Sequence, residues 1–380
     1  MIKRIAVIEL YYHHEVVQQF LDLLSTAKVD LTLITLSEIH SYLELEEDQR
    51  IETHVFAHRQ AAFHFLNANT WEADLCIMTT IAQDYKQWSQ MRWPCPSLLL
   101  VHNWYAFTQP LNHLRLKQHF SLSLAMKSFY KILLQREAYY KKKLLAQVDF
   151  IAPFAIQQSH VDHLADRASR SYIEPLSLLY EKVVKPKPKR HELFTILVPG
   201  RVEAKSKDLA CLEHFLEHLL RSPIGAEVRV VLMGKVGAAL QNRISQWKQK
   251  AKSIQLKEGY LTTVAYQECI QQADLLFLPL KAACPYSIYV EKMGQSKASG
   301  TISDAIHWTK PALIPSFYPK PRGFENLFFH YDKGDWSATI QQIIELKNKT
   351  QGFPKTNLWS KKQASAQLLY RLNLLLADAQ

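Results

Sequence analysis

Short apolar runs rich in β-branched residues alternate with longer segments that repeat apolar residues at helical spacing. In the first half the runs occupy residues 5–10, 29–35, 73–80, 96–103 and 148–153, and helical patterns cover 15–27, 58–69 and 81–90. Strands buried on both faces of a parallel sheet have continuous apolar sequences. Strands that alternate with helices are typical of βαβ units. The first half is therefore predicted to form a doubly wound parallel sheet.

The same alternation restarts after a proline- and lysine-rich segment, 182–192. Such a segment stays extended and solvated, which predicts a linker at 183–192 between domains 1–182 and 193–358. In the second half, strands are predicted at 194–200, 228–234, 254–261, 275–280 and 311–317. The predicted fold class is α/β, with two Rossmann-like, doubly wound parallel-sheet domains that face each other across a cleft.

The net charge indicates which classes of partner the protein favours, and the cysteine content indicates the redox state of its compartment. The 380 residues carry a formal net charge of +11, which favours anionic partners such as nucleic acid, acidic lipid or phosphate-bearing small molecules. The five cysteines are scattered without a C-x-x-C pair, which is typical of a reducing cytoplasm. The N-terminal apolar run is too short for a signal peptide, and no run reaches the roughly 18 apolar residues of a membrane span.

A glycine and several basic residues follow the first predicted strand of the second domain. Gly200 permits a sharp turn, Arg201 offers a planar fork for phosphate oxygens, and Lys205 and Lys207 add charge. The segment is a candidate phosphate site. The alternative is a solvated basic loop.

A second candidate anion site lies where a helix is predicted to begin. Ser299, Gly300 and Thr301 would offer free backbone amides at the positive end of the helix dipole. Asp304, about one turn later, could accept both hydroxyls of a ribose. The alternative is that these residues only cap the helix and complement its dipole.

His102 and Asn103 directly follow the apolar strand 96–101, and His13 and His14 follow the first strand in the same way. At a strand's carboxyl end they would point into the cleft, where His102 could bond a sugar hydroxyl or move a proton. Since the chain has 16 histidines, a structural role for any one of them is the competing interpretation.

The segment 113–147 has a basic and an apolar side. At roughly helical period, one face carries Leu122, Met126, Phe129, Leu133 and Tyr140, and the opposite face carries Lys127, Lys131 and Lys142. The pattern predicts a basic helix that touches anionic lipid, or else an ordinary surface helix.

Residues 194–317 resemble the donor domain of glycosyltransferase family 4. The resemblance rests on VPGRVEAKSKDL (198–209), on VVLMG (230–234), on the turn, helix, Ala-Asp and strand of 259–280, and on DAIHWTKPALIP (304–315). No dinucleotide, Walker, zinc-protease or serine-hydrolase motif is present. The resemblance implies a GT-B fold whose C-terminal helix, 359–380, packs back on the first domain.

The resemblance also implies site residues. Arg201 and Lys207 match residues that bind the donor diphosphate, Asp304 matches a ribose ligand, and His102 matches a histidine near the transferred sugar. The family has a second glutamate eight positions before the ribose ligand. Here Ser296 stands at that position, and Glu291 is the acidic candidate for its catalytic role.

The predicted function is transfer of a sugar from a nucleoside diphosphate sugar to a glycan, lipid-linked or small-molecule acceptor, in surface polysaccharide or glycoconjugate synthesis. Neither metal nor cofactor is expected, because fixed cations and helix dipoles would stabilise the leaving diphosphate. Nucleic acid is not an expected partner. The expected location is the cytoplasm, with peripheral contact at the inner membrane face. Open alternatives are a nucleotide-sugar epimerase of the same fold and a non-catalytic nucleotide-sugar-binding protein.

Overall fold

The computed structural model of the protein describes most of the chain. The described residues are 2–27, 29–45, 50–117, 121–154, 176, 178–182, 193–203, 205, 207–234, 238–250, 253–257, 259, 261–348 and 360–378. The predicted linker, 183–192, lies outside them.

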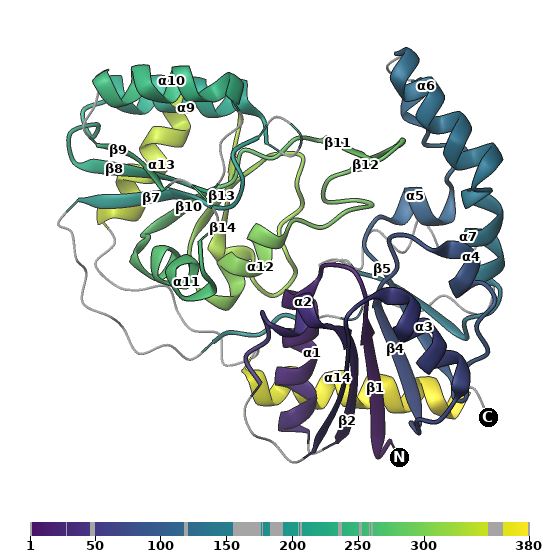
Figure 1. The fold of residues 1–380 in the computed structure, drawn as a ribbon. Coiled ribbons are helices and arrows are strands. Elements are labelled where there is room, and N and C mark those ends of the chain that lie inside the picture. The colour runs from purple at the N-terminus through teal and green to yellow at the C-terminus, as the bar shows by residue number, and fades with distance from the viewer. Residues whose placement is uncertain are drawn as a thin grey trace.

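The first domain is built on a parallel sheet of six strands in the order β3-β2-β1-β4-β5-β6 (Figure 1). Its strands are β1 (Arg4–Glu9), β2 (Asp30–Leu36), β3 (Ile51–Phe56), β4 (Leu75–Thr80), β5 (Ser97–Val101) and β6 (Phe150–Pro153). The helices between them are α1 (His14–Thr26), α2 (Ser37–His40), α3 (Arg59–Ala68), α4 (Tyr85–Trp88), α5 (Trp104–Thr108), α6 (Leu122–Phe129) and α7 (Glu137–Leu145). The order reverses between β1 and β4, which places a ligand-binding crevice at the carboxyl ends of these two strands.

The second domain repeats this topology in the order β14-β13-β10-β7-β8-β9, again with parallel pairing. Its strands are β7 (Phe194–Val198), β8 (Val228–Met233), β9 (Ile254–Lys257), β10 (Leu275–Phe277), β13 (Ala312–Pro315) and β14 (Phe328–Tyr331). Its helices are α9 (Leu209–Arg221), α10 (Ala238–Lys250), α11 (Thr263–Gln272), α12 (Gly300–His307) and α13 (Trp336–Asn348), with a 3-10 turn at Glu325–Leu327. The prediction of two doubly wound α/β domains is confirmed.

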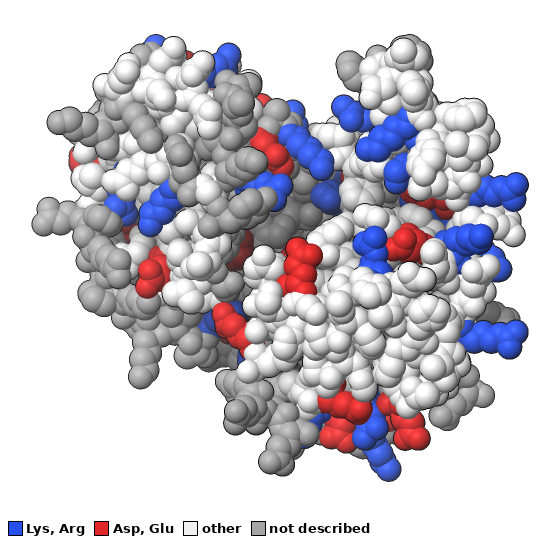
Figure 2. All heavy atoms as spheres, in the orientation of Figure 1, with Lys and Arg blue, Asp and Glu red and all other residues white. Residues whose placement is uncertain are grey.

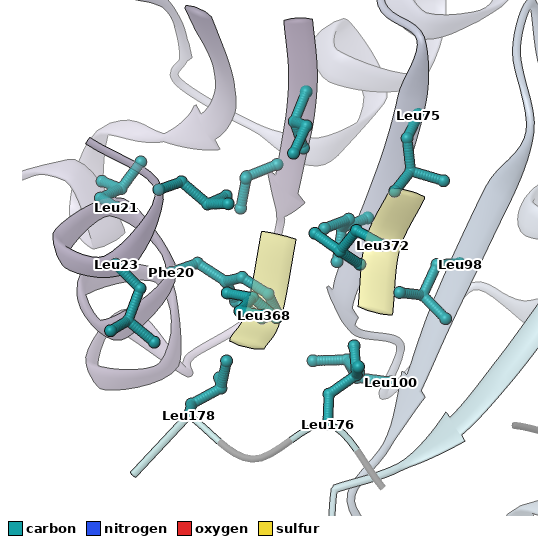
Figure 3. Packing of buried hydrophobic residues seen from close by; sticks show 14 of the residues in the cluster. Phe20, Leu21, Leu23, Leu75, Leu98, Leu100, Leu176, Leu178, Leu368 and Leu372 are labelled. Carbon is teal, nitrogen blue, oxygen red and sulfur yellow. The ribbon is translucent and has the colours of Figure 1, made fainter. Parts of the chain in front are cut away.

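Helix α14 (Lys361–Asp378) lies on the first domain although it follows the second domain in sequence (Figure 1). Figure 3 shows Leu368 and Leu372 between Phe20 of α1 and Leu98 of β5. The hydroxyl of Ser365 donates to the carbonyl of Leu23 at 2.6 Å. The helix therefore completes the apolar core on one face of the first sheet.

A two-stranded hairpin from the second domain reaches into the first. Strands β11 (Ala283–Tyr286) and β12 (Tyr289–Lys292) form it, and the hairpin extends toward α5 in Figure 1. The amide of Val290 donates to the carbonyl of His113 at 2.9 Å, and the amide of Arg115 donates to that of Ile288 at 2.8 Å. Tyr289 is fully buried with Leu124 of α6. The two domains are thus joined by packing as well as by covalent connection.

A buried ion pair lies beneath this hairpin. Lys141 and Glu137, on α7, are 1% and 4% exposed and lie 2.6 Å apart. Glu137 also pairs with Lys131 at 2.8 Å and accepts a bond from the hydroxyl of Tyr289 at 3.1 Å. The ammonium of Lys141 donates to the carbonyl of Ala106 at 2.7 Å. The network links α5, α7 and the hairpin.

The prediction of one helix over 113–147 is wrong. The segment consists of a 3-10 turn (Arg115–Lys117), α6, a π-helical turn (Tyr130–Leu134) and α7. It breaks at Arg136, whose φ of 49° lies in the left-handed region. Residues 118–120 lie outside the described residues. None of the described helices combines the length and the apolar character that a bilayer span requires.

Candidate functional site

The carboxyl ends of the two sheets face the hollow between the lobes, and Figure 2 shows Lys and Arg side chains on both of its walls. On the first domain, Glu9 shapes the turn that follows β1. The buried carboxylate accepts bonds from the amide of Tyr11 and the hydroxyl of Thr79, both at 2.7 Å. Burial raises the pKa of Glu9. The carboxylate of Glu9 therefore fixes the turn between β1 and α1, and this turn contains no glycine.

His102 lies in a stack of rings at the end of β5. The centroid of its ring lies 4.2 Å from that of His13 and 4.4 Å from that of Phe154. His102 Nε2 lies 2.8 Å from the carbonyl oxygen of Thr79. Because a carbonyl only accepts, Nε2 carries the hydrogen and Nδ1 of the neutral ring is an acceptor. Burial, then the charges of His13 and Lys297, hold the pKa of His102 well below its usual value. The ring is therefore suited to accept a hydrogen bond from a hydroxyl.

The two predicted anion-binding segments of the second domain lie against each other. Gly200 follows the end of β7 with a φ of 74°, and a Cβ built on it would lie 3.9 Å from Thr301 Cγ2. A Cβ on Gly234, after β8, would lie 3.2 Å from the carbonyl of Gly200, so a side chain there would crowd the turn. Arg201 is exposed at this point. The hydroxyls of Ser299 and Thr301 bond each other at 2.8 Å, and Ser299 makes no side-chain cap to α12.

Lys207 and Asp304 lie behind these segments. Lys207 is 4% exposed, and its ammonium donates to the carbonyl of Pro199 at 2.7 Å. Burial lowers the pKa of Lys207 to about 8, against the opposing charge of Asp304. Asp304 accepts a bond of 2.6 Å from the hydroxyl of Tyr266. Burial, together with the charge of Glu15 on α1 of the first domain, raises the pKa of Asp304 to about 6.

Glu291 is fully buried on β12. One carboxylate oxygen accepts from the amide of Ala106 at 2.7 Å and the other from the amide of Tyr105 at 3.3 Å. Both amides belong to the first turn of α5, where a carboxylate complements the helix dipole. Ser296 lies beside it, and the carbonyl of Ser296 accepts from the amide of Trp104 at 2.9 Å. Glu291 thus holds α5 directly after His102 and Asn103; its catalytic role stays a prediction.

Two residues of the site had no assigned role in the sequence analysis. Lys297 Nζ donates to Asn103 Oδ1 at 2.8 Å across the domain boundary, and Tyr266 bonds Asp304. Asn103 and Lys297 are 194 positions apart, so no local pattern connects them. In the sequence, the one sign that Lys297 belongs to the site is its position two residues before Ser299. Within the described part of the chain, no three His, Cys, Asp or Glu side chains gather as metal ligands would.

The chain matches no protein-family model and no curated protein at the level of sequence. Solved structures do match over nearly the whole chain. HepE from Anabaena, in complex with UDP and glucose, has a TM-score of 0.56 at 12% identity, covering 99% of this chain and 100% of that one. MnaA from S. aureus, in complex with UDP, has a TM-score of 0.52 at 13% identity, covering 98% and 97%. The fold is of the GT-B type.

The N-terminal domain of trehalose-6-phosphate phosphatase from Candida albicans also has this arrangement, with a TM-score of 0.56 at 12% identity, covering 99% of this chain and 96% of that one. Identities this low establish the shared GT-B fold alone, because one fold can carry many activities. The expected GT-B fold is confirmed, while membership of glycosyltransferase family 4 stays a prediction.

Proposed function

We propose that the protein is a glycosyltransferase whose second domain binds a nucleoside diphosphate sugar. The observation that carries the proposal is the closeness of the Gly200 turn to Thr301 at the carboxyl end of the second sheet, where a Cβ on Gly200 would lie 3.9 Å from Thr301 Cγ2. This arrangement brings Arg201 and the first amides of α12 to one place, with Lys207 behind them. Two proteins of similar fold were solved with UDP, which makes UDP sugars the first donors to test.

In the proposed reaction the bond between the sugar and the diphosphate breaks, and the acceptor oxygen takes the sugar. Negative charge then grows on the diphosphate. Arg201, Lys207 and the α12 amides would stabilise that charge more in the transition state than in the ground state. Asp304 would accept the ribose hydroxyls, with Tyr266 fixing its carboxylate. His102 Nδ1 would accept a hydroxyl of the sugar or of the acceptor.

The acceptor would enter from the first domain, as a glycan, a lipid-linked sugar or a small molecule. A role in surface polysaccharide or glycoconjugate synthesis in the cytoplasm is part of the proposal, as is independence of metal ions. The proposal also includes a hexose as the transferred sugar and membership of glycosyltransferase family 4. It further includes binding of the diphosphate by Ser299 and Gly300.

A thermal-shift screen against UDP, GDP, ADP and CMP sugars tests the proposal. A ligand that binds only the folded state adds about 2.7 kcal/mol of stability at one hundred times its dissociation constant. One series is expected to raise the melting temperature clearly, and its sugar is expected to be released or transferred when acceptors are added. A folded protein that none of the four series stabilises would contradict the proposal.

The raised pKa of Asp304 leads us to expect that donor binding depends on pH. Its pKa of about 6 means that the carboxyl becomes protonated as the pH falls through 6, and one of its oxygens then no longer accepts a bond from the ribose. Affinity for UDP-glucose, measured by calorimetry, is expected to fall several-fold between about pH 7.5 and about pH 5.

Without a ligand, the contribution of Asp304 to folding stability depends on pH with the opposite sign. Because the folded pKa of Asp304 is raised, this group contributes stability at low pH that is lost as the pH rises from about 4 through 6. Weaker binding at pH 5 would therefore not come from a loss of stability at this group. The Asp304→Asn variant is expected to bind weakly at both pH values. Equal affinity of the unaltered protein at both would remove Asp304 from the ribose site.

We also propose that α6 and the π turn contact an anionic membrane surface. The two elements project from the first domain in Figure 1, and six large apolar side chains on them are more than half exposed. These are Leu122, Met126, Phe129, Tyr130, Leu133 and Leu134. Lys127, Arg136 and Lys142 are exposed on the same segment. Apolar side chains that enter the interface beside basic ones are typical of peripheral membrane helices.

Replacing both Met126 and Phe129 by serine is expected to weaken binding to vesicles of phosphatidylglycerol by at least about tenfold, since each side chain loses its apolar burial. Co-sedimentation with the vesicles measures it. Val264→Ser, at a side chain 63% exposed on α11, is the matched control and should bind as the unaltered protein does. Equal binding of the double variant and the control would end the membrane proposal.

A further inference from the structure

Lys297 is a cation that lies partly buried at the junction of the two domains without an acidic partner. Its ammonium donates to the amide oxygen of Asn103 at 2.8 Å and lies 5.5 Å from the centre of the Tyr286 ring. Among the described residues, no carboxylate lies within ion-pair distance of Lys297. Glu291 contributes charge from further away, but both of its oxygens are bonded to amides of α5. A buried charge is costly unless an opposite charge meets it.

The groups around Lys297 are suited to a carboxylate. The Lys297 ammonium has three hydrogens, and the bond to Asn103 uses one of them. The amide nitrogen of Asn103 carries two further hydrogens. Both side chains therefore carry donors at the domain boundary. A carboxylate is an acceptor with two oxygens, and it can take one donor from each side chain.

The neighbouring positions contain no opposing charge. Ser296, next to Lys297, carries no charge. A glutamate there would pair with Lys297 or repel an incoming anion; the Ser296 hydroxyl instead bonds the backbone of Lys292 at 2.8 Å. The charge of Lys205 also reaches Lys297. An incoming anion therefore meets two cations, while the Glu291 carboxylate is held by the amides of α5.

We propose that Lys297 and Asn103 bind a carboxylate on the sugar of the donor, so that the protein selects a nucleotide sugar of the uronic acid class. The inference rests on the proposed function. Lys297 precedes the Ser299–Thr301 segment, where the diphosphate is proposed to bind, and Asn103 follows His102 on the opposite wall. A sugar attached to that diphosphate reaches this hydrogen-bonded pair, and its carboxylate supplies the missing acidic partner.

The test compares the binding of UDP, UDP-glucose and UDP-glucuronic acid by calorimetry. The unaltered protein is expected to bind UDP-glucuronic acid at least about tenfold more tightly than UDP-glucose, as a charge-assisted pair would give. Lys297→Gln is expected to abolish this preference and to leave the affinity for UDP unchanged. Asn103→Asp is expected to abolish it too, because the new carboxylate pairs with Lys297.

Lys292→Gln is the matched control, since Lys292 is exposed on the same segment and should keep the preference. Melting temperatures without ligand show whether each variant is folded. Equal binding of the two sugars by the unaltered protein overturns the inference and leaves the proposed function standing. A loss of UDP affinity in Lys297→Gln also overturns it, because Lys297 would then bind the diphosphate. A folded protein that binds none of the three ligands overturns the inference, and it contradicts the proposed function as well if no other series of the thermal-shift screen stabilises the protein.

Discussion

Replacing Glu137 by alanine is expected to lower the free energy of unfolding by about 3–5 kcal/mol, the usual cost of removing one partner of a buried pair. Lys141, only 1% exposed, would keep its charge without the carboxylate at 2.6 Å. Lys131 and the hydroxyl of Tyr289 would lose the same partner. Since Tyr289 lies on the hairpin of the second domain, the loss also weakens the contact between the domains.

Urea titration followed by tryptophan fluorescence and by circular dichroism measures this change. Glu213→Ala is the matched control: it breaks the ion pair with Arg243, which is 53% exposed, and should cost at most about 1 kcal/mol. The double variant Glu137→Leu, Lys141→Met removes both charges and is expected to be more stable than Glu137→Ala alone. If the free energy of unfolding of Glu137→Ala lies within about 1 kcal/mol of that of the control, the network does not contribute the stability assigned to it.

Replacing Arg201 by alanine is expected to lower the turnover of sugar transfer by about 100- to 1000-fold, the usual effect of removing one donor to a transition-state oxyanion. Arg201 is exposed directly after Gly200, on the turn that lies near Thr301. Its planar fork suits two phosphate oxygens. The loss should appear mainly in turnover, because charge on the diphosphate grows as the sugar leaves.

Initial rates with saturating donor, in the series that the thermal-shift screen selects, measure the effect. Arg221→Ala, at an exposed arginine at the end of α9, is the control and should react normally. Arg201→Lys should fall between the two, since it keeps the charge and loses the fork. Full activity of a folded Arg201→Ala variant would remove Arg201 from the mechanism.

Most of the fold could be predicted from the sequence, because strands buried on both faces leave continuous apolar runs. Strand β3 was missed because it lies at the sheet edge, where none of its residues is fully buried and no continuous apolar run marks it. Strand β14 and helix α13 were also missed. The hairpin β11–β12 was not predicted either: it contains Pro285, and its partners, such as His113, lie far away in sequence. Hydrophobic periodicity does not record such contacts.

The candidate site could be predicted only in part, for a related reason. Gly200, Arg201 and Thr301 follow from the rule that glycines and helix starts at strand ends face the ligand crevice. Lys297 and Tyr266 act through contacts with Asn103 and Asp304, and those contacts exist only after folding. The amphipathic pattern near Met126 indicated a helix with an apolar side, but it could not show whether that side was covered.

Helix α14 also determines when the first domain can finish folding during synthesis on the ribosome. The bond between Ser365 and Leu23 joins residues 342 positions apart, and that between Ile2 and Asn373 joins residues 371 apart. The second domain can fold as it emerges, while the face of the first sheet that α14 covers stays bare until the helix has left the exit tunnel. Contacts so distant form late and expose apolar surface meanwhile. Nascent chains that stall before residue 361 are therefore expected to recruit chaperones through Phe20 and Leu98.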